Sequence, residues 1–186
     1  QRQMCIRDSK WDGGSAKLDA CMELVTAAVE GGHRILLFSQ FTSMLELLAK
    51  RLDEEGISHF TLQGSTPKPV RAELVRRFNG GEVSVFLISL RAGGTGLNLT
   101  AADIVIHYDP WWNLAAQNQA TDRAYRIGQR NPVQVYRLIA QDTIEEKIVE
   151  LQQAKQSLAD TVTGGADGAI LSMNPEQLLQ LLGEEA

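Results

Sequence analysis

Residues 83–129 decide the fold and read VSVFLISLRAGGTGLNLTAADIVIHYDPWWNLAAQNQATDRAYRIGQ. This stretch holds two apolar runs typical of buried strands, with a glycine-rich turn between them. A tryptophan pair follows the second run, and two arginines three residues apart come after the pair. A domain with a purely structural role does not require a glycine-rich turn, a tryptophan pair and two close arginines in one short span. We therefore interpret the stretch as the functional edge of the fold.

Short apolar runs alternate with helical patterns along the rest of the chain. The strands are predicted over residues 34–39, 58–62, 83–89, 104–108 and 133–140. Helices are predicted to begin at the capping residues Ser15, Ser43 and Thr66, with Pro67 as the first helical residue after Thr66. Most gaps between strands are long enough for a crossover helix. The pattern therefore predicts an α/β fold, a parallel sheet with helices on both faces and loops at the strand ends that form the site.

The chain is predicted to have three parts. Residues 1–14 include a start that matches no periodic pattern and lacks an initial methionine, so we expect a disordered or non-native stretch on a piece of a longer protein. Residues 15–142 form the α/β domain. Residues 143–186 form a helical extension, with a long helix from Thr143 to about Val162, a glycine linker and a last short helix over 174–182.

Composition excludes several classes of protein. The two cysteines, Cys5 and Cys21, form no CxxC pair, so neither a disulfide framework nor a metal site is predicted, and a reducing compartment fits best. No apolar run is long enough to cross a bilayer, and we expect no membrane partner. The net charge of −5 is uneven: nine acidic and two basic residues follow from Asp142 onward, which leaves +2 on residues 1–141. A local basic patch could therefore attract nucleic acid.

The glycines of the central stretch allow more than one interpretation. Gly93, Gly94 and Gly96 follow a strand, where backbone N–H groups can approach a phosphate closely. A dinucleotide fingerprint fails, because Leu99 stands where its third glycine would be and another strand follows instead of a long helix. A purely structural turn is the alternative. The chain also lacks any GxxxxGK[ST] loop that would hold a nucleoside triphosphate by itself.

Two arginines are the most informative charged residues. On a continuous helix, Gln119, Arg123 and Arg126 would share one face, and two guanidinium groups so close repel each other unless an anion neutralises them. An ion pair between Asp122 and Arg126 on a solvated face is the simpler alternative. Because this helix follows two loops at the sheet edge, a ligand carried by another domain could reach the arginines.

Four motifs together carry a family resemblance. They are RILLFSQF over 34–41, SLRAGGTGLNL over 89–99, DPWWN over 109–113 and QATDRAYRIGQ over 119–129. The chain resembles the second RecA-like lobe of a Swi/Snf-type ATPase of helicase superfamily two, over nearly its whole length and in the same motif order. Leu114 departs from the pattern, since the family usually has proline after WWN.

The resemblance implies half of an ATP site. In such motors ATP with Mg²⁺ lies in the cleft between two lobes, and the N-terminal RecA-like lobe, absent from this chain, supplies the phosphate-binding lysine and the acidic magnesium site. Arg123 and Arg126 would then be arginine fingers that stabilise charge on the transferring phosphoryl group. Gln119 would orient them. The nucleotide-binding set on this lobe would be Gly93, Gly94, Gly96 and Asp122.

The resemblance also implies double-stranded DNA as a partner, contacted through backbone phosphates. The expected contacts are polar residues at the strand ends: Ser39, Gln40, Thr42, Ser65, Ser89 and Thr95. Helix capping by Ser43 and Thr66 is an equally open interpretation of the hydroxyl residues near them. Trp111 and Trp112 would couple the DNA side to the ATP side; the alternative is that one ring fills the core and the other covers an edge.

Two classes of function remain. The first is the C-terminal motor lobe of a DNA-dependent ATPase that translocates on duplex DNA. Such a protein would act in the cytoplasm or nucleoid of a prokaryote or in the nucleus of a eukaryote. DNA-bound proteins would be its further partners. The second is a RecA-like module that binds nucleic acid or protein without catalysis. The intact RxxRxGQ sequence favours the first, because a lobe without ATP chemistry has no physical need for paired cations facing a cleft.

Overall fold

The computed structural model describes residues 15–90, 97–111, 114–122, 124 and 132–163 of the chain, and the side chains of 114–116 and 156–163 lie outside the description. The chain forms two compact units, Gln1–Glu146 and Lys147–Ala186. The first unit holds the sheet and all the residues discussed below. Among the described residues, no helix combines the length and apolar character needed to cross a membrane.

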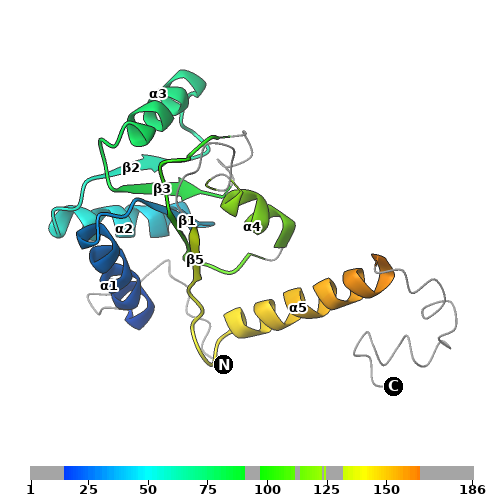
Figure 1. The fold of residues 1–186 in the computed structure, drawn as a ribbon. Coiled ribbons are helices and arrows are strands. Elements are labelled where there is room, and N and C mark those ends of the chain that lie inside the picture. The colour runs from blue at the N-terminus through cyan, green and yellow to red at the C-terminus, as the bar shows by residue number, and fades with distance from the viewer. Residues whose placement is uncertain (1–14, 91–96, 112–113, 123, 125–131, 164–186) are drawn as a thin grey trace, which may run out of the picture. The chain divides into compact units, whose positions relative to one another are not determined.

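Strands and helices alternate as predicted, except that β4 follows β3 with no helix between them among the described residues (Figure 1). The strands are β1 (Ile35–Ser39), β2 (His59–Leu62), β3 (Val85–Ser89), β4 (Ile104–His107) and β5 (Gln134–Arg137). The helices are α1 (Ala16–Glu30), α2 (Thr42–Glu54), α3 (Lys68–Asn79), α4 (Leu114–Thr121) and α5 (Ile144–Thr163). The predicted linker and last short helix after residue 163 lie outside the described residues.

The five strands form one parallel sheet in the order β2-β3-β1-β4-β5. The central strand β1 pairs with β3 and β4, so that Ile35 lies beside Val85 and Ile104. Every residue of β1 and β3 is buried, because helices cover both faces of a parallel sheet. This arrangement confirms the predicted RecA-like α/β architecture.

Two apolar cores lie on the two faces of the sheet, since successive strand side chains point to opposite faces. Ile35 and Leu37 of β1 pack with α1 and α2 in one core. Leu36 and Phe38 belong to the other core, which includes Phe78 of α3 and residues of α4. Figure 1 shows α1 and α2 on one side of the sheet and α3 on the other.

Two predicted helix starts were wrong by one or two residues. The helix α2 begins at Thr42, with Phe41 in the N-cap position where the sequence predicted Ser43. The helix α3 begins at Lys68, and Pro67 lies in the N-cap position with an extended ψ of 148°. Proline restricts φ and leaves ψ open, so the sequence could not decide whether Pro67 was inside the helix. The Thr66 hydroxyl accepts a hydrogen bond from the Gln63 N–H at 3.1 Å instead of capping α3.

Candidate functional site

The carboxyl ends of the parallel strands meet at one edge of the sheet, and the polar residues predicted from the motifs lie there. Ser39 and Ser89 end β1 and β3 and are register partners. The Leu90 N–H donates to the Ser39 carbonyl at 3.1 Å, and the Tyr108 N–H donates to the Phe38 carbonyl at 2.9 Å. The segments after β1, β3 and β4 are therefore held together directly beyond the sheet.

Ser39 and Ser89 are both buried, although the sequence predicted DNA contacts for their hydroxyl groups. Gln40 is half-buried, whereas Thr42 and Ser65 are exposed. A direct bond to a DNA phosphate requires an accessible donor, so Gln40, Thr42 and Ser65 are the better placed of the predicted contacts. Thr95 lies outside the described residues.

Asp109 joins the ends of β1 and β4 by hydrogen bonds. Its Oδ2 accepts from the Ser39 hydroxyl at 2.5 Å and from the Gln40 backbone N–H at 3.2 Å. Burial raises the pKa of Asp109, and the bonds from Ser39 and Gln40 oppose that rise because they stabilise the ionised carboxylate. The Ser39 oxygen also accepts from the Phe41 N–H at 3.2 Å. One buried carboxylate thus shapes the whole turn between β1 and α2.

Two further bonds hold the segment after Asp109. The Gln40 side-chain amide donates to the Pro110 carbonyl at 3.3 Å. The Trp111 N–H donates to Oε1 of Gln117, a buried residue of α4, at 3.3 Å. Trp111 itself is half-buried, and Trp112 lies outside the described residues. The segment Asp109–Trp111 therefore bridges the end of β1 and the helix α4.

The loop between β2 and α3 is shaped by Arg71, which the sequence analysis missed. Its guanidinium donates to the carbonyls of Thr66 and Gly64, each at 2.7 Å. These bonds fold the loop so that Ser65 stays exposed at the sheet edge. A single arginine in a basic helix gives no periodic signal, and only the folded loop identifies its carbonyl partners.

His107 ends β4 and is buried beside α4. Its Nε2 lies 2.9 Å from the Thr121 hydroxyl, and its ring stacks on Phe38 with centroids 5.5 Å apart. Burial lowers the pKa of His107 to about 4, and the positive charge of Arg137 acts in the same direction. His107 is therefore neutral at physiological pH and ties β4 to the last residue of α4. No local sequence motif marks His107 as a residue of this site.

The predicted nucleotide-facing residues are only partly described. Gln119 lies on α4 and Asp122 follows it, and both side chains are exposed. The helix α4 ends at Thr121, five residues earlier than a helix that would include Arg126. Arg123 and Arg126 lie outside the described residues, as do Gly93, Gly94 and Gly96. The predicted grouping of Gln119 with the two arginines therefore stays a prediction.

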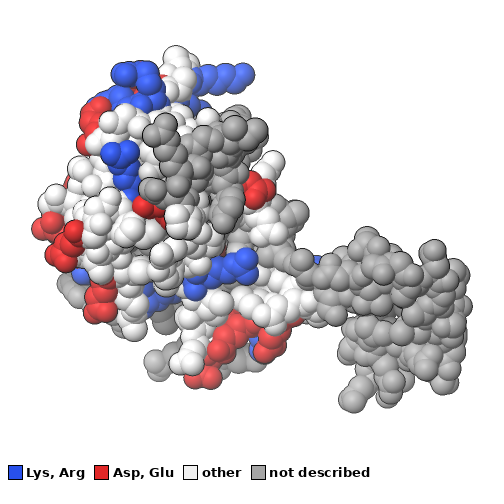
Figure 2. Space-filling view, in the orientation of Figure 1, with Lys and Arg blue, Asp and Glu red and all other residues white. Residues whose placement is uncertain are grey.

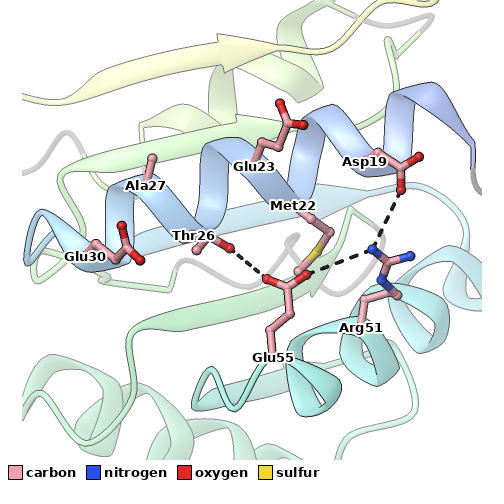
Figure 3. Close-up of a pocket in the computed structure, with 8 residues that line it drawn as sticks. All are labelled: Asp19, Met22, Glu23, Thr26, Ala27, Glu30, Arg51 and Glu55. Carbon is pink, nitrogen blue, oxygen red and sulfur yellow. Dashed lines mark hydrogen bonds and ion pairs between the residues drawn. The ribbon is translucent and has the colours of Figure 1, made fainter.

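A groove between α1 and α2 is a separate feature (Figure 3). Its acidic residues surround Arg51, which pairs with Asp19 at 3.7 Å and with Glu55 at 4.0 Å. The Thr26 hydroxyl donates to Glu55 at 2.8 Å. The excess of carboxylates disfavours a phosphate ligand in this groove. Within the described part of the chain, no group of three His, Cys, Asp or Glu residues is arranged to hold a metal ion.

Basic residues gather over α3 in the space-filling view (Figure 2). This helix carries Lys68, Arg71, Arg76 and Arg77 within twelve residues. Arg76 pairs with Glu73, and Arg77 pairs with Glu82. Part of this positive charge is therefore compensated locally.

Comparison with known proteins decides the family. The family model described as the helicase conserved C-terminal domain matches residues 16–128, more than half of the chain. The chain belongs to this family. The match covers the elements from α1 through α4 and continues beyond them to residue 128, and it confirms the resemblance drawn from the four motifs.

Relatives of this helicase C-terminal domain are found in bacteria and eukaryotes. An uncharacterized ATP-dependent helicase of Mycoplasma pneumoniae is 43% identical over 97% of the chain, which covers 18% of that protein. The putative ATP-dependent helicase/translocase YwqA of Bacillus subtilis is 43% identical over 91% of the chain and 18% of its own length. The human chromatin-remodeling ATPase INO80 is 41% identical over 90% of the chain and 11% of its own length. The chain thus spans less than a fifth of the curated relatives it matches.

A solved structure has the same fold. The C-terminal part of the Fun30 ATPase domain superposes with a TM-score of 0.71 at 37% identity, covering 74% of this chain and 45% of the Fun30 chain. This likeness agrees with the parallel sheet and its two helical layers. The helicase C-terminal domain described here is thus similar to one part of a larger ATPase domain.

Proposed function

We propose that this helicase C-terminal domain is the second motor lobe of an ATP-dependent translocase on double-stranded DNA. Its relatives carry the names of ATP-dependent helicases and a chromatin-remodeling ATPase. The 186 residues contain no GxxxxGK[ST] loop. A second lobe of the same parent protein would therefore hold the ATP phosphates and Mg²⁺, and this lobe would complete the site.

The observation that carries the proposal is the position of α4 at the functional edge. The segment Asp109–Trp111 bonds to Gln117 of α4, and the QATDRAYRIGQ sequence begins two residues later at Gln119. Arginines that follow this helix would emerge next to the strand ends, where parallel α/β folds bind their ligands. We assign Arg123 and Arg126 as the arginine fingers, Gln119 as the residue that orients them, and Gly93, Gly94, Gly96 and Asp122 as the nucleotide-facing group.

The same edge would contact the DNA backbone. Gln40 and Thr42 follow β1, and Ser65 follows β2, so donors from two loops lie at the carboxyl ends of the two strands that flank β3. The helix α2 begins at Thr42, and the free N–H groups of a helix N-terminus favour a phosphate. Such contacts read the backbone and not the base sequence. Trp111 and Trp112, which precede α4 in the sequence, would couple DNA contact to ATP turnover. The protein would then act in the nucleoid or the nucleus, where DNA-bound proteins are further partners.

Substitution of the fingers in the complete parent protein tests the proposal. Arg126→Ala and Arg123→Ala should each lower DNA-stimulated ATP turnover about a thousandfold, because a finger stabilises charge that develops only in the transition state. DNA binding, measured by fluorescence anisotropy on a labelled duplex, should persist. The matched control is Arg76→Ala, which removes an exposed arginine paired with Glu73 and should leave turnover unchanged.

Two outcomes would contradict the assignment. Loss of DNA binding with retained basal hydrolysis would place the arginines on the DNA instead of the nucleotide. Full turnover in both variants would favour the alternative function, a RecA-like module that binds nucleic acid or protein without catalysis.

A further inference from the structure

Two aspartates bind β4 to β1, one at each end of β4. At the amino end, Asp103 accepts from the Arg34 N–H at 3.0 Å and lies 2.8 Å from Nδ1 of His33. At the carboxyl end, Asp109 accepts from the Gln40 N–H at 3.2 Å and from the Ser39 hydroxyl at 2.5 Å. Both carboxylates therefore bind a backbone N–H next to β1. The two bonds differ in position: Arg34 lies just before β1, whereas Gln40 lies in the turn between β1 and α2.

The segment held by Asp109 belongs to the functional edge. Ser39 links Asp109 to the next residue of the turn, because its hydroxyl group donates to Asp109 and its oxygen accepts from the Phe41 N–H at 3.2 Å. The N–H groups of Gln40 and Phe41 are both bound in this network, so the turn before Thr42 is constrained by two hydrogen bonds. That turn sets where the Gln40 side chain lies and where α2 begins.

The Gln40 side chain has donor capacity beyond this network. Its amide nitrogen carries two hydrogens, and one bond, to the Pro110 carbonyl at 3.3 Å, accounts for one of them. The side chain is half-buried, so the other hydrogen can face an acceptor outside the protein. A phosphate oxygen of DNA is such an acceptor.

A buried carboxylate at position 109 is unfavourable in free energy. Asp109 is 6% exposed, and burying a charge is unfavourable unless hydrogen bonds compensate it. Both described bonds fall on the single oxygen Oδ2, which a neutral amide could also supply. The benefit of the carboxylate is that charge-assisted bonds are shorter and stronger, so they restrict the turn more tightly.

We infer that Asp109 is a positioning residue that holds the turn after β1, and with it Gln40 and the start of α2, in place for contact with the DNA backbone. This inference rests on the proposed function. It adds a residue that would act on DNA affinity through Ser39 and Gln40, without touching DNA or nucleotide itself.

The test measures DNA-stimulated ATP turnover of the complete parent protein against the concentration of a duplex of random sequence. Asp109→Ala should raise the DNA concentration for half-maximal stimulation about tenfold, as expected when hydrogen bonds to a charged group are lost. Turnover at saturating DNA should fall less than about twofold, since the turn is restored on binding. Asp109→Asn keeps an oxygen for both bonds and should recover most of the affinity.

Asp103→Ala is the matched control. It removes the corresponding carboxylate at the other end of β4, so its thermal stability should fall while its DNA dependence stays within about twofold of the parent. If Asp109→Ala lowered thermal stability but left the half-saturating DNA concentration unchanged, Asp109 would be a purely structural residue and the inference would be wrong. An equal rise in that concentration for Asp103→Ala would overturn the inference in the same way.

Ser39→Ala keeps the test decisive if Asp109→Ala does not fold. Loss of the Ser39 hydroxyl removes the bond to Asp109 and the acceptor for the Phe41 N–H, so it should raise the half-saturating DNA concentration at least about threefold. An unchanged value in a folded Ser39→Ala variant overturns the inference. A parent protein that shows no DNA stimulation at all instead contradicts the proposed function, which separates the two failures.

Discussion

His107 shows how a single buried residue can set the pH dependence of this domain. The Thr121 hydroxyl lies 3.3 Å from the Gln117 carbonyl and can donate to it, which leaves the oxygen of Thr121 to accept from Nε2 of His107. The Nδ1 atom of His107 is then a buried acceptor with no hydrogen-bond partner among the described residues. Protonation would place a charge in this apolar site, next to Arg137, and for that reason the pKa of His107 falls to about 4.

The free energy of unfolding should therefore fall as the pH falls from about 6.5 toward 4. In this window the unfolded chain binds a proton at His107 and the folded chain does not, so acid favours unfolding. The contribution of His107 between about pH 7.5 and about pH 5 should be on the order of 2 kcal/mol. Urea unfolding of the chain at both pH values measures it.

Substitutions of two of the chain's three histidines separate this effect from general acid denaturation. In His107→Gln the loss of unfolding free energy between about pH 7.5 and about pH 5 should be smaller by about 2 kcal/mol. The remaining loss would come from the titration of carboxylates. His33→Gln removes a histidine whose side chain is 45% exposed and should leave most of the pH dependence in place. Equal pH profiles for His107→Gln and the unchanged chain would contradict the assignment.

Three helix ends of the domain have the same construction. A glycine with positive φ follows each of α1, α2 and α3: Gly32, Gly56 and Gly81. After α2, the Gly56 N–H donates to Asp53 and the Ile57 N–H donates to Leu52, and equivalent pairs of bonds end the other two helices. Each pair is a Schellman motif, in which the left-handed glycine returns the chain toward the sheet. Glycine at these three positions is therefore favoured by backbone geometry.

Gly56→Ala should lower the stability of the chain by about 1 kcal/mol. An added Cβ at Gly56 meets nothing within 4 Å, so the cost comes from the φ of +69° alone. Gly64→Ala is the matched control, because its Cβ also meets nothing within 4 Å and its φ lies outside the left-handed region. Chemical unfolding of both variants compares them, and an equal cost for the two would refute the role of φ. Gly56→Asn should recover part of the loss, since asparagine tolerates this conformation.

A helix start has a weaker sequence signal than a helix end of this kind. The positive φ that ends a helix selects glycine, whereas several residue types can precede a first turn. Phe41 takes the N-cap position of α2 because the Asp109 and Ser39 network holds the turn before it, and no local pattern contains Asp109. The first four strands were predicted to within two residues at each end, since a short apolar run between turn signals has few other solutions. The fifth was predicted over 133–140 and ends three residues earlier, at Arg137.

At the scale of the whole molecule, this helicase C-terminal domain should lack ATPase activity by itself. It has no GxxxxGK[ST] loop to hold the phosphates, and arginine fingers without bound ATP have no charge to stabilise. Phosphate release by the pure chain, with and without duplex DNA, should stay at the level of a blank without protein. The complete parent protein under the same conditions is the positive control, and robust hydrolysis by the 186-residue chain would refute the prediction.

Sequence patterns alone predicted the parallel α/β sheet, the burial of its central strands and the family. These features follow from hydrophobic periodicity and from motifs whose residues are neighbours in the chain. Only the tertiary structure decided that Ser39 and Ser89 are buried, that Asp109 holds the turn after β1, and that His107 bonds to α4. Ser39 and Asp109 are 70 residues apart, and no spacing rule joins them, because parallel strands bring their ends together only after the crossover helices have packed.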